Sequence, residues 1–170
     1  MRTQSLALLS LSLWVIIISS SFDAVLSKRY MRCELARKLL QQHGFERSLL
    51  PVWICLLEHE SDLDTAKITA NPNGSSSYGL FQINTRYCQQ DRRGGVCNIK
   101  CEGKFKPPSQ SKPKSIICLR FADLLDENLR ESASCAKRIQ TSEGFRHWNG
   151  WQRYCRNTQN LPNLKVICGI

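Results

Sequence analysis

Nine cysteines, all of them C-terminal to residue 32, constrain the fold of this chain more than any other feature. None of their spacings forms the paired Cys-X-X-Cys sets that hold structural zinc, so we expect no metal site of that kind. In a secreted chain, cysteines form a disulfide framework that stabilises a small domain. Because the number is odd, one thiol has no partner, and the sequence alone does not choose among the pairings of the others.

The N-terminus indicates that the chain is secreted. An apolar run over residues 6–21 follows Arg2, and small residues precede a cleavage point near Ser27. This pattern predicts a signal peptide over residues 1–27 and an extracellular domain over residues 28–170. A membrane anchor is the alternative, but the uninterrupted apolar run is short for a bilayer span. We therefore expect no stable membrane insertion.

The net charge of the chain is +10. A strongly basic secreted protein suits an anionic partner, such as a bacterial cell wall, an acidic glycan or a membrane surface. We predict no nucleic-acid partner, because no block of Lys and Arg is interleaved with aromatic residues.

Two helices are predicted in the first part of the mature chain. Leucines spaced along residues 33–43 share one face, and Gly44 provides the stop. Ser48 is the predicted N-cap of the second helix, with Pro51 tolerated in its first turn. A further helical pattern begins at Asp123.

The second helix brings a carboxyl group to the edge of an apolar stripe. Trp53, Leu56, Leu57 and Glu60 are spaced by three and four residues, so they share a face. Burial of a carboxyl favours its protonated form, which allows it to donate a proton. The alternative is an exposed Glu60 at a frayed helix end. No second histidine follows His59 at the spacing of a zinc-protease helix.

Residues 68–84 are predicted to form a small antiparallel sheet. Asn73-Gly74 predicts a two-residue hairpin turn, because both residue types accept positive φ. Asn73-Gly74-Ser75 is also an N-glycosylation acceptor pattern. The turn explains the same residues, so both interpretations stay open. The strand-favouring residues are Tyr78, Leu80, Phe81 and Ile83.

Together these segments resemble the C-type lysozymes over nearly the whole predicted mature chain. The matching pieces are Cys33–Arg37, Cys55 with Glu60-Ser61, Tyr78–Asn84, Cys97–Cys101, Ser134–Ile139 and Trp148–Cys155. The resemblance implies an α+β fold with a helical lobe, a small sheet lobe and a cleft between them. It also implies a monomer without cofactor or metal. The implied disulfides are Cys33–Cys168, Cys55–Cys155, Cys88–Cys101 and Cys97–Cys135.

The family's reaction is hydrolysis of the β-1,4 bond between N-acetylmuramic acid and N-acetylglucosamine in bacterial peptidoglycan, a bacteriolytic and antimicrobial activity. One carboxylic acid protonates the leaving oxygen, and an ionised carboxylate attacks or stabilises the oxocarbenium-like centre. The resemblance assigns the acid to Glu60 and places Trp148 beside it. It implies glycan contacts from Gln82, Asn84, Tyr87 and Trp148. The alternative is that these four residues only support the fold.

The second carboxylate is absent from this sequence. The family pattern has an Asp immediately before the Tyr-Gly of the sheet, and Ser77 stands there. A neutral hydroxyl does not supply the negative charge that the developing cation needs, so we expect weak hydrolysis. Neither Asp62 nor Asp64 is expected to reach the opposite wall. The family pattern also carries two aromatic residues before the next cysteine, whereas only Tyr87 precedes Cys88.

Residues 103–122 have no counterpart in the family pattern. Removing them restores the family spacing between Cys101 and Cys135, eliminates the odd Cys118 and lowers the net charge from +10 to +5. One explanation is a genuine basic loop with a free thiol. The other, which we favour, is translated intron sequence, because the codons for Gly103-Lys104 and for Ala122 can contain splice signals.

Three functions remain open. The first is a secreted lysozyme of weak activity, and the second is a non-catalytic glycan-binding protein that keeps the cleft. The third is a cationic antimicrobial protein acting on anionic membranes, which needs charge but no carboxylates. Calcium binding is not predicted, because Lys100, Asp123, Asp126 and Glu127 do not reproduce the ligand ring of the lactalbumin relatives.

Overall fold

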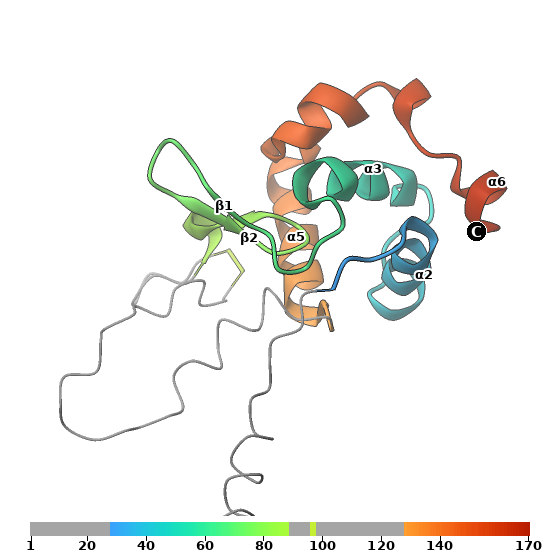
Figure 1. The fold of residues 1–170 in the computed structure, drawn as a ribbon, viewed down its shortest axis with the longest axis horizontal. Coiled ribbons are helices and arrows are strands. Elements are labelled where there is room, and N and C mark those ends of the chain that lie inside the picture. The colour runs from blue at the N-terminus through green and yellow to red at the C-terminus, as the bar shows by residue number, and fades with distance from the viewer. Residues whose placement is uncertain (1–27, 89–95, 98–127) are drawn as a thin grey trace, which may run out of the picture.

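A computed structural model describes residues 28–88, 96–97 and 128–170 (Figure 1). The predicted signal peptide, Cys101 and the segment 103–122 with Cys118 lie outside the described residues. The start of the helical pattern at Asp123 and the acidic residues considered as calcium ligands lie outside them as well.

Helices and a small sheet occupy separate parts of the molecule, as Figure 1 shows. The α-helices are α2 (Arg32–Gln42), α3 (Leu50–Ser61), α5 (Arg130–Glu143) and α6 (Leu164–Cys168). The strands are β1 (Ile68–Ala70), β2 (Ser76–Tyr78) and β3 (Ile83–Asn84). Short helical turns are η1 (Thr85–Tyr87), η3 (Phe145–His147), η4 (Trp151–Cys155) and η5 (Thr158–Asn160). The predicted α+β architecture is confirmed.

The first two predicted helices are present, but one predicted cap is wrong. Gly44 has a φ of +62° just past α2, so it ends that helix as expected. Ser48 does not cap α3, whose N-cap residue is Leu49 and makes no side-chain cap. The preceding turn explains the difference. The carbonyls of Arg47 and Leu49 accept the N–H groups of Leu50 and Trp53, and Pro51 has no N–H to satisfy.

The antiparallel sheet is confirmed, and its strand order is β1-β2-β3. Ser77, in the middle of β2, lies opposite Thr69 on one side and Asn84 on the other. Leu80 and Phe81 are not in strands. They lie in the turn between β2 and β3, where both are fully buried.

The predicted two-residue hairpin turn at Asn73-Gly74 is wrong. Gly74 adopts a φ of +79°, but Asn73 does not have a positive φ. The connection runs over residues 71–75 instead and contains a turn in which the Gly74 N–H donates to the Asn71 carbonyl at 3.0 Å. Pro72 explains this geometry, because its fixed φ suits the second position of a turn that begins at Asn71.

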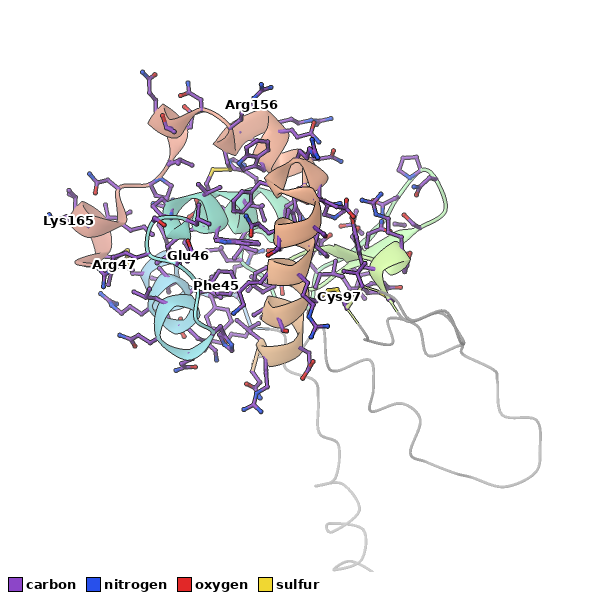
Figure 2. The ribbon with its side chains drawn as sticks, turned by 180° about the vertical axis from the view of Figure 1, so that it is seen from behind. Phe45, Glu46, Arg47, Cys97, Arg156 and Lys165 are labelled. Atoms are coloured by element: carbon purple, nitrogen blue, oxygen red, sulfur yellow. A yellow bond between two sulfur atoms is a disulfide. The ribbon has the colours of Figure 1, made fainter. Side chains whose placement is uncertain are left out.

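An aromatic cluster forms the centre of the core between the helices and the sheet. The Trp53 ring lies 5.1 Å from Phe45, 6.0 Å from Phe81 and 5.4 Å from Trp148, centroid to centroid. Figure 2 shows Phe45 near the middle of the helical lobe, while Arg47 and Lys165 lie on the side of that lobe away from the sheet. The core thus joins α3 to the turn after β2.

Three of the implied disulfides are confirmed: Cys33–Cys168, Cys55–Cys155 and Cys97–Cys135. Cys88 is also disulfide-bonded, and its predicted partner Cys101 lies outside the described residues. These crosslinks join α2 to α6, α3 to η4, and Cys97 to α5. Within the described ranges, no helix is long and apolar enough to cross a membrane.

Candidate functional site

A pocket of about 490 Å³ lies between the helical lobe and the sheet. One wall, which we call the helical wall, is formed by Glu60, His147, Trp148 and Asn149. The other, which we call the sheet wall, is formed by Lys67, Thr69, Asn71, Pro72, Asn73, Ser77, Gln82 and Asn84. Glu60 is the only carboxylate among the described residues that line this pocket.

Glu60 lies at the end of α3, where its helix face meets the pocket. The face that carries Trp53, Leu56 and Leu57 is buried, so the helix is fixed against the core. The Gly150 N–H donates to Glu60 Oε1 at 2.6 Å, and this bond holds the carboxyl from the side of the helical lobe. The structure therefore places Glu60 in the pocket wall and not at a frayed, exposed helix end.

Gly150 permits this close approach of backbone to carboxylate. A Cβ atom at Gly150 would lie 3.0 Å from Glu60 Oε1 and 3.2 Å from His59 Cβ. Both distances are shorter than ordinary Cβ contacts, so a larger residue would require Glu60 or His59 to move by a few tenths of an ångström. The missing side chain at Gly150 thus leaves room for the Glu60 carboxyl beside the Gly150 N–H. Sequence patterns alone gave no signal for that role.

Trp148 combines a core position with a pocket position. It is 2% exposed, and its indole Nε1–H donates to the Phe81 carbonyl at 2.8 Å. This bond joins the helical wall to the turn between β2 and β3. Trp148 therefore supports the fold and also lines the pocket.

The sheet wall contains neutral polar groups where the family pattern has a carboxylate. Ser77 Oγ accepts a hydrogen bond from Asn71 Nδ2 at 3.1 Å, and the same Nδ2 donates to Ser75 Oγ at 3.0 Å. Asp62 pairs with Arg29 at 2.8 Å, and Asp64 accepts the Ala66 N–H. Neither aspartate lines the pocket.

The structure brings most of the predicted glycan contacts to the pocket, with Tyr87 as the exception. Gln82 lines the pocket but is 4% exposed, and its Nε2 donates to the carbonyls of Lys67 and Gly79. Asn84 lines it from β3. Tyr87 is 3% exposed and does not line the pocket.

Tyr87 belongs instead to a polar cluster that joins the two lobes beside the pocket. Its hydroxyl lies 2.7 Å from Glu143 Oε2 and 2.9 Å from His147 Nδ1. The Arg86 guanidinium donates to the Tyr87 hydroxyl, to His147 Nδ1 and, at 3.0 Å, to Glu143 Oε2. We call these four residues the interlobe cluster. Arg86 and Tyr87 come from η1, and Glu143 and His147 come from α5 and η3.

Burial perturbs two groups of the interlobe cluster. It raises the pKa of Tyr87 to about 12, with the Glu143 carboxylate acting in the same direction. It lowers the pKa of His147 to about 4, with the Arg86 charge acting in the same direction. His147 is therefore neutral near pH 7. Because arginine only donates, His147 Nδ1 accepts from Arg86, and the ring proton is on Nε2.

His147, Arg86 and Glu143 were missed by the sequence reasoning. His147 could have been found from its position directly before Trp148. Within the described part of the chain, one group of potential metal ligands is close together, namely Cys55, His59 and Cys155. The two cysteines of that group form a disulfide, so they offer no thiolates.

Comparison with known proteins agrees with this geometry. A family model described as the C-type lysozyme/alpha-lactalbumin family matches residues 28–108 and 104–168. The two matched segments overlap at residues 104–108, which lie inside the stretch 103–122 that has no counterpart in the family pattern. A lysozyme of Bombyx mori is 39% identical over 140 residues, which are 81% of this chain and 85% of the relative. The alpha-lactalbumin of Oryctolagus cuniculus is 34% identical over 147 residues, which are 86% of this chain and 91% of the relative.

A solved structure gives the same result for the fold. The crystal structure of a lysozyme from Litopenaeus vannamei superposes with a TM-score of 0.62 at 27% identity. The match covers 83% of this chain and 97% of that chain. Sequence, disulfides and fold therefore agree, and the chain belongs to the C-type lysozyme/α-lactalbumin family.

Proposed function

We propose that this protein is secreted, binds bacterial peptidoglycan in the pocket between its lobes, and hydrolyses the β-1,4 glycan bond weakly. Family membership and relatives named as lysozymes support the substrate class. The disulfide framework supports an extracellular location. The observation that carries the proposal is the composition of the pocket. Glu60 lines the helical wall, and Ser77 lines the sheet wall without a carboxylate.

Glu60 acts as the general acid in this proposal. Its Oε1 is held by the Gly150 N–H, so Oε2 is the oxygen available to carry the proton. Oε2 donates that proton to the glycosidic oxygen as the bond to the leaving sugar breaks. The helical wall thus supplies the acid half of the reaction.

The sheet wall supplies no negative charge for the cationic centre that then develops, since its one ionisable residue is Lys67. Ser77 Oγ accepts a hydrogen bond from Asn71, so its own hydrogen remains to position a water molecule. A positioned water attacks the centre but does not stabilise its charge. Removing a preorganised charged group of this kind costs several kcal/mol, on the order of a hundredfold in rate. Weak hydrolysis is the expected result.

A turnover assay on purified bacterial walls tests the proposal. Glu60→Gln should abolish the weak activity, because an amide can donate a hydrogen bond but is not acidic enough to transfer a proton to the leaving oxygen. Ser77→Asp should raise the activity by about a hundredfold, because it restores the negative charge. Ser76→Asp is the matched control, since neighbouring residues of a strand point to opposite faces, and it should give no gain. Turnover that survives Glu60→Gln would overturn the assignment of the acid.

A non-catalytic glycan-binding protein is the second candidate, and the missing carboxylate is the observation that favours it. The wall preparation separates the two candidates. Binding to walls without turnover in the wild type, followed by turnover in Ser77→Asp, would identify a binding protein with an intact cleft. Bacterial killing that is independent of Glu60 and lost at high salt would instead indicate action of the net charge on anionic membranes.

A further inference from the structure

We propose that Asn73 is an N-glycosylation site, and that its glycan stands at the rim of the pocket and limits access of insoluble wall polymers. The first part of the proposal is independent of the protein's activity. The second part rests on the proposed peptidoglycan-binding function.

The acceptor pattern occurs once in the whole chain. Asn73-Gly74-Ser75 is the only Asn-X-Ser/Thr among the 170 residues with X other than proline. The sequence pattern alone allowed a tight turn as a complete explanation. The structure excludes that two-residue turn, because Asn73 does not adopt the positive φ that it requires, and places Asn73 in a longer connection over residues 71–75.

The loop that carries Asn73 is accessible. Asn73 is exposed, and Figure 1 shows the connection between β1 and β2 projecting away from α3 and α5. A Cβ built at the neighbouring Gly74 meets nothing within 4 Å, so the tip of the loop is surrounded by open space. A bulky transferase and a branched sugar can therefore approach this loop without displacing the core.

The amide nitrogen that would carry the sugar makes no hydrogen bond to the part of the chain that the structure describes. Asn73 Oδ1 accepts from the Ser75 N–H at 3.0 Å and from the Ser75 hydroxyl at 2.7 Å. Both bonds use Oδ1, and the residue is exposed, so neither bond has to break for a sugar to join Nδ2. The Ser75 hydroxyl of the acceptor pattern is thereby already in contact with the acceptor amide.

The modification is a group transfer from a lipid-linked pyrophosphate oligosaccharide in the secretory pathway. A bond forms between Asn73 Nδ2 and C1 of the first N-acetylglucosamine. The bond from C1 to the pyrophosphate oxygen breaks, and the lipid pyrophosphate leaves with the electron pair. Nδ2 gives up one proton to a base of the transferase.

The position of Asn73 on the sheet wall gives the glycan a consequence. Asn71, Pro72 and Asn73 all line the pocket, so a sugar on Asn73 begins at its rim. A hydrated glycan there occupies space that an insoluble wall polymer must cross, whereas a short soluble fragment can still enter. Glycosylation would thus shift the preference of the pocket from intact walls toward soluble fragments.

The modification is tested on the full chain secreted from insect cells. Intact mass before and after treatment with an N-glycan amidase should fall for the wild type, and peptide mapping should locate the change at Asn73. Asn73→Gln and Ser75→Ala should show no mass change, while Ser75→Thr should keep the glycan because it preserves the acceptor pattern. A secreted wild type without the glycan, or a glycan that persists in Asn73→Gln, would overturn the site.

The rim effect is tested on the wild type secreted with and without an inhibitor of N-glycosylation. The two samples share one sequence, so the hydrogen bonds that Ser75 accepts from the pocket-lining Asn71 and Asn84 are the same in both. The unglycosylated sample should bind insoluble walls several-fold better, and both samples should bind a soluble peptidoglycan fragment equally. Equal binding to walls would overturn the rim effect. A glycan at Asn73 on a protein that binds neither walls nor fragments would support the site and overturn the peptidoglycan-binding function.

Discussion

The helical wall of the pocket is anchored in the hydrophobic core through Trp148, whereas the sheet wall is built from polar side chains of three short strands and the segments that join them. Trp148 is buried on the helical wall, and Glu60 is fixed there by a backbone N–H. On the sheet wall, Ser77 is half-buried and bonded to one asparagine. Packing therefore fixes the side chains of the helical wall more strongly than those of the sheet wall.

The largest difference between the walls should appear in stability when Trp148 is truncated. Trp148→Ala should reduce the free energy of unfolding by about 3–5 kcal/mol, because it opens a cavity in the core. It also leaves the buried Phe81 carbonyl without its donor. Denaturant unfolding with the disulfides intact measures the change.

Tyr154 is the matched control for that experiment. It is an aromatic residue of the same lobe, but it is 47% exposed and stacks on His59 at the surface. Tyr154→Ala should cost well below 1 kcal/mol of stability if burial decides the effect, as for most surface substitutions. A comparable loss in the two variants would show that the helical wall is not anchored through Trp148.

The next largest effect should be a pH dependence of stability that comes from His147. Folding lowers its pKa to about 4 from an ordinary value of 6.5, so the folded state favours the neutral ring. The unfolded state takes up its proton first as the pH falls. The stabilisation is therefore complete above pH 6.5 and is lost as the pH falls toward 4. The loss at pH 4.5 relative to pH 7 should be about 2–3 kcal/mol.

His147→Gln tests this prediction by removing the titration while keeping a hydrogen-bonding side chain. The loss of unfolding free energy between pH 7 and pH 4.5 should be smaller in this variant than in the wild type. Carboxylates and His43, whose pKa burial also lowers, titrate in both proteins and cancel in the difference. An unchanged dependence in His147→Gln would show that the interlobe cluster does not hold a neutral histidine.

The sequence predicted the position of Glu60 on the helical wall because local spacing and packing agree there. Trp53, Leu56, Leu57 and Glu60 are neighbours on one helix, so three- and four-residue spacing was enough to place the carboxyl at an apolar edge. The disulfides required the resemblance, since spacing does not determine pairing. Gly150 was not predicted, because its role depends on a carboxylate far away in the sequence.

The sheet wall and the interlobe cluster were harder to predict for a physical reason. The hairpin prediction considered Asn73-Gly74 alone, but Pro72 moved the turn one step earlier. Tyr87 was expected on the pocket because tyrosine suits sugar stacking. Its burial beside Glu143 and His147 depends on contacts between segments some sixty residues apart, and no local pattern contains such information.

The smallest effect on stability should separate two asparagines, Asn71 on the sheet wall and Asn149 on the helical wall. Asn71 on the sheet wall donates to Ser75 and Ser77, so Asn71→Ala leaves both hydroxyls without this donor. The free energy of unfolding should fall by about 1 kcal/mol, the usual net contribution of such partly buried bonds. Asn149 lines the helical wall but is exposed, and Asn149→Ala should leave stability nearly unchanged. A loss for Asn71→Ala as small as that for Asn149→Ala would contradict this. It would mean that the sheet wall does not depend on its own polar network, and that the strand pairing of β2 alone holds Ser77.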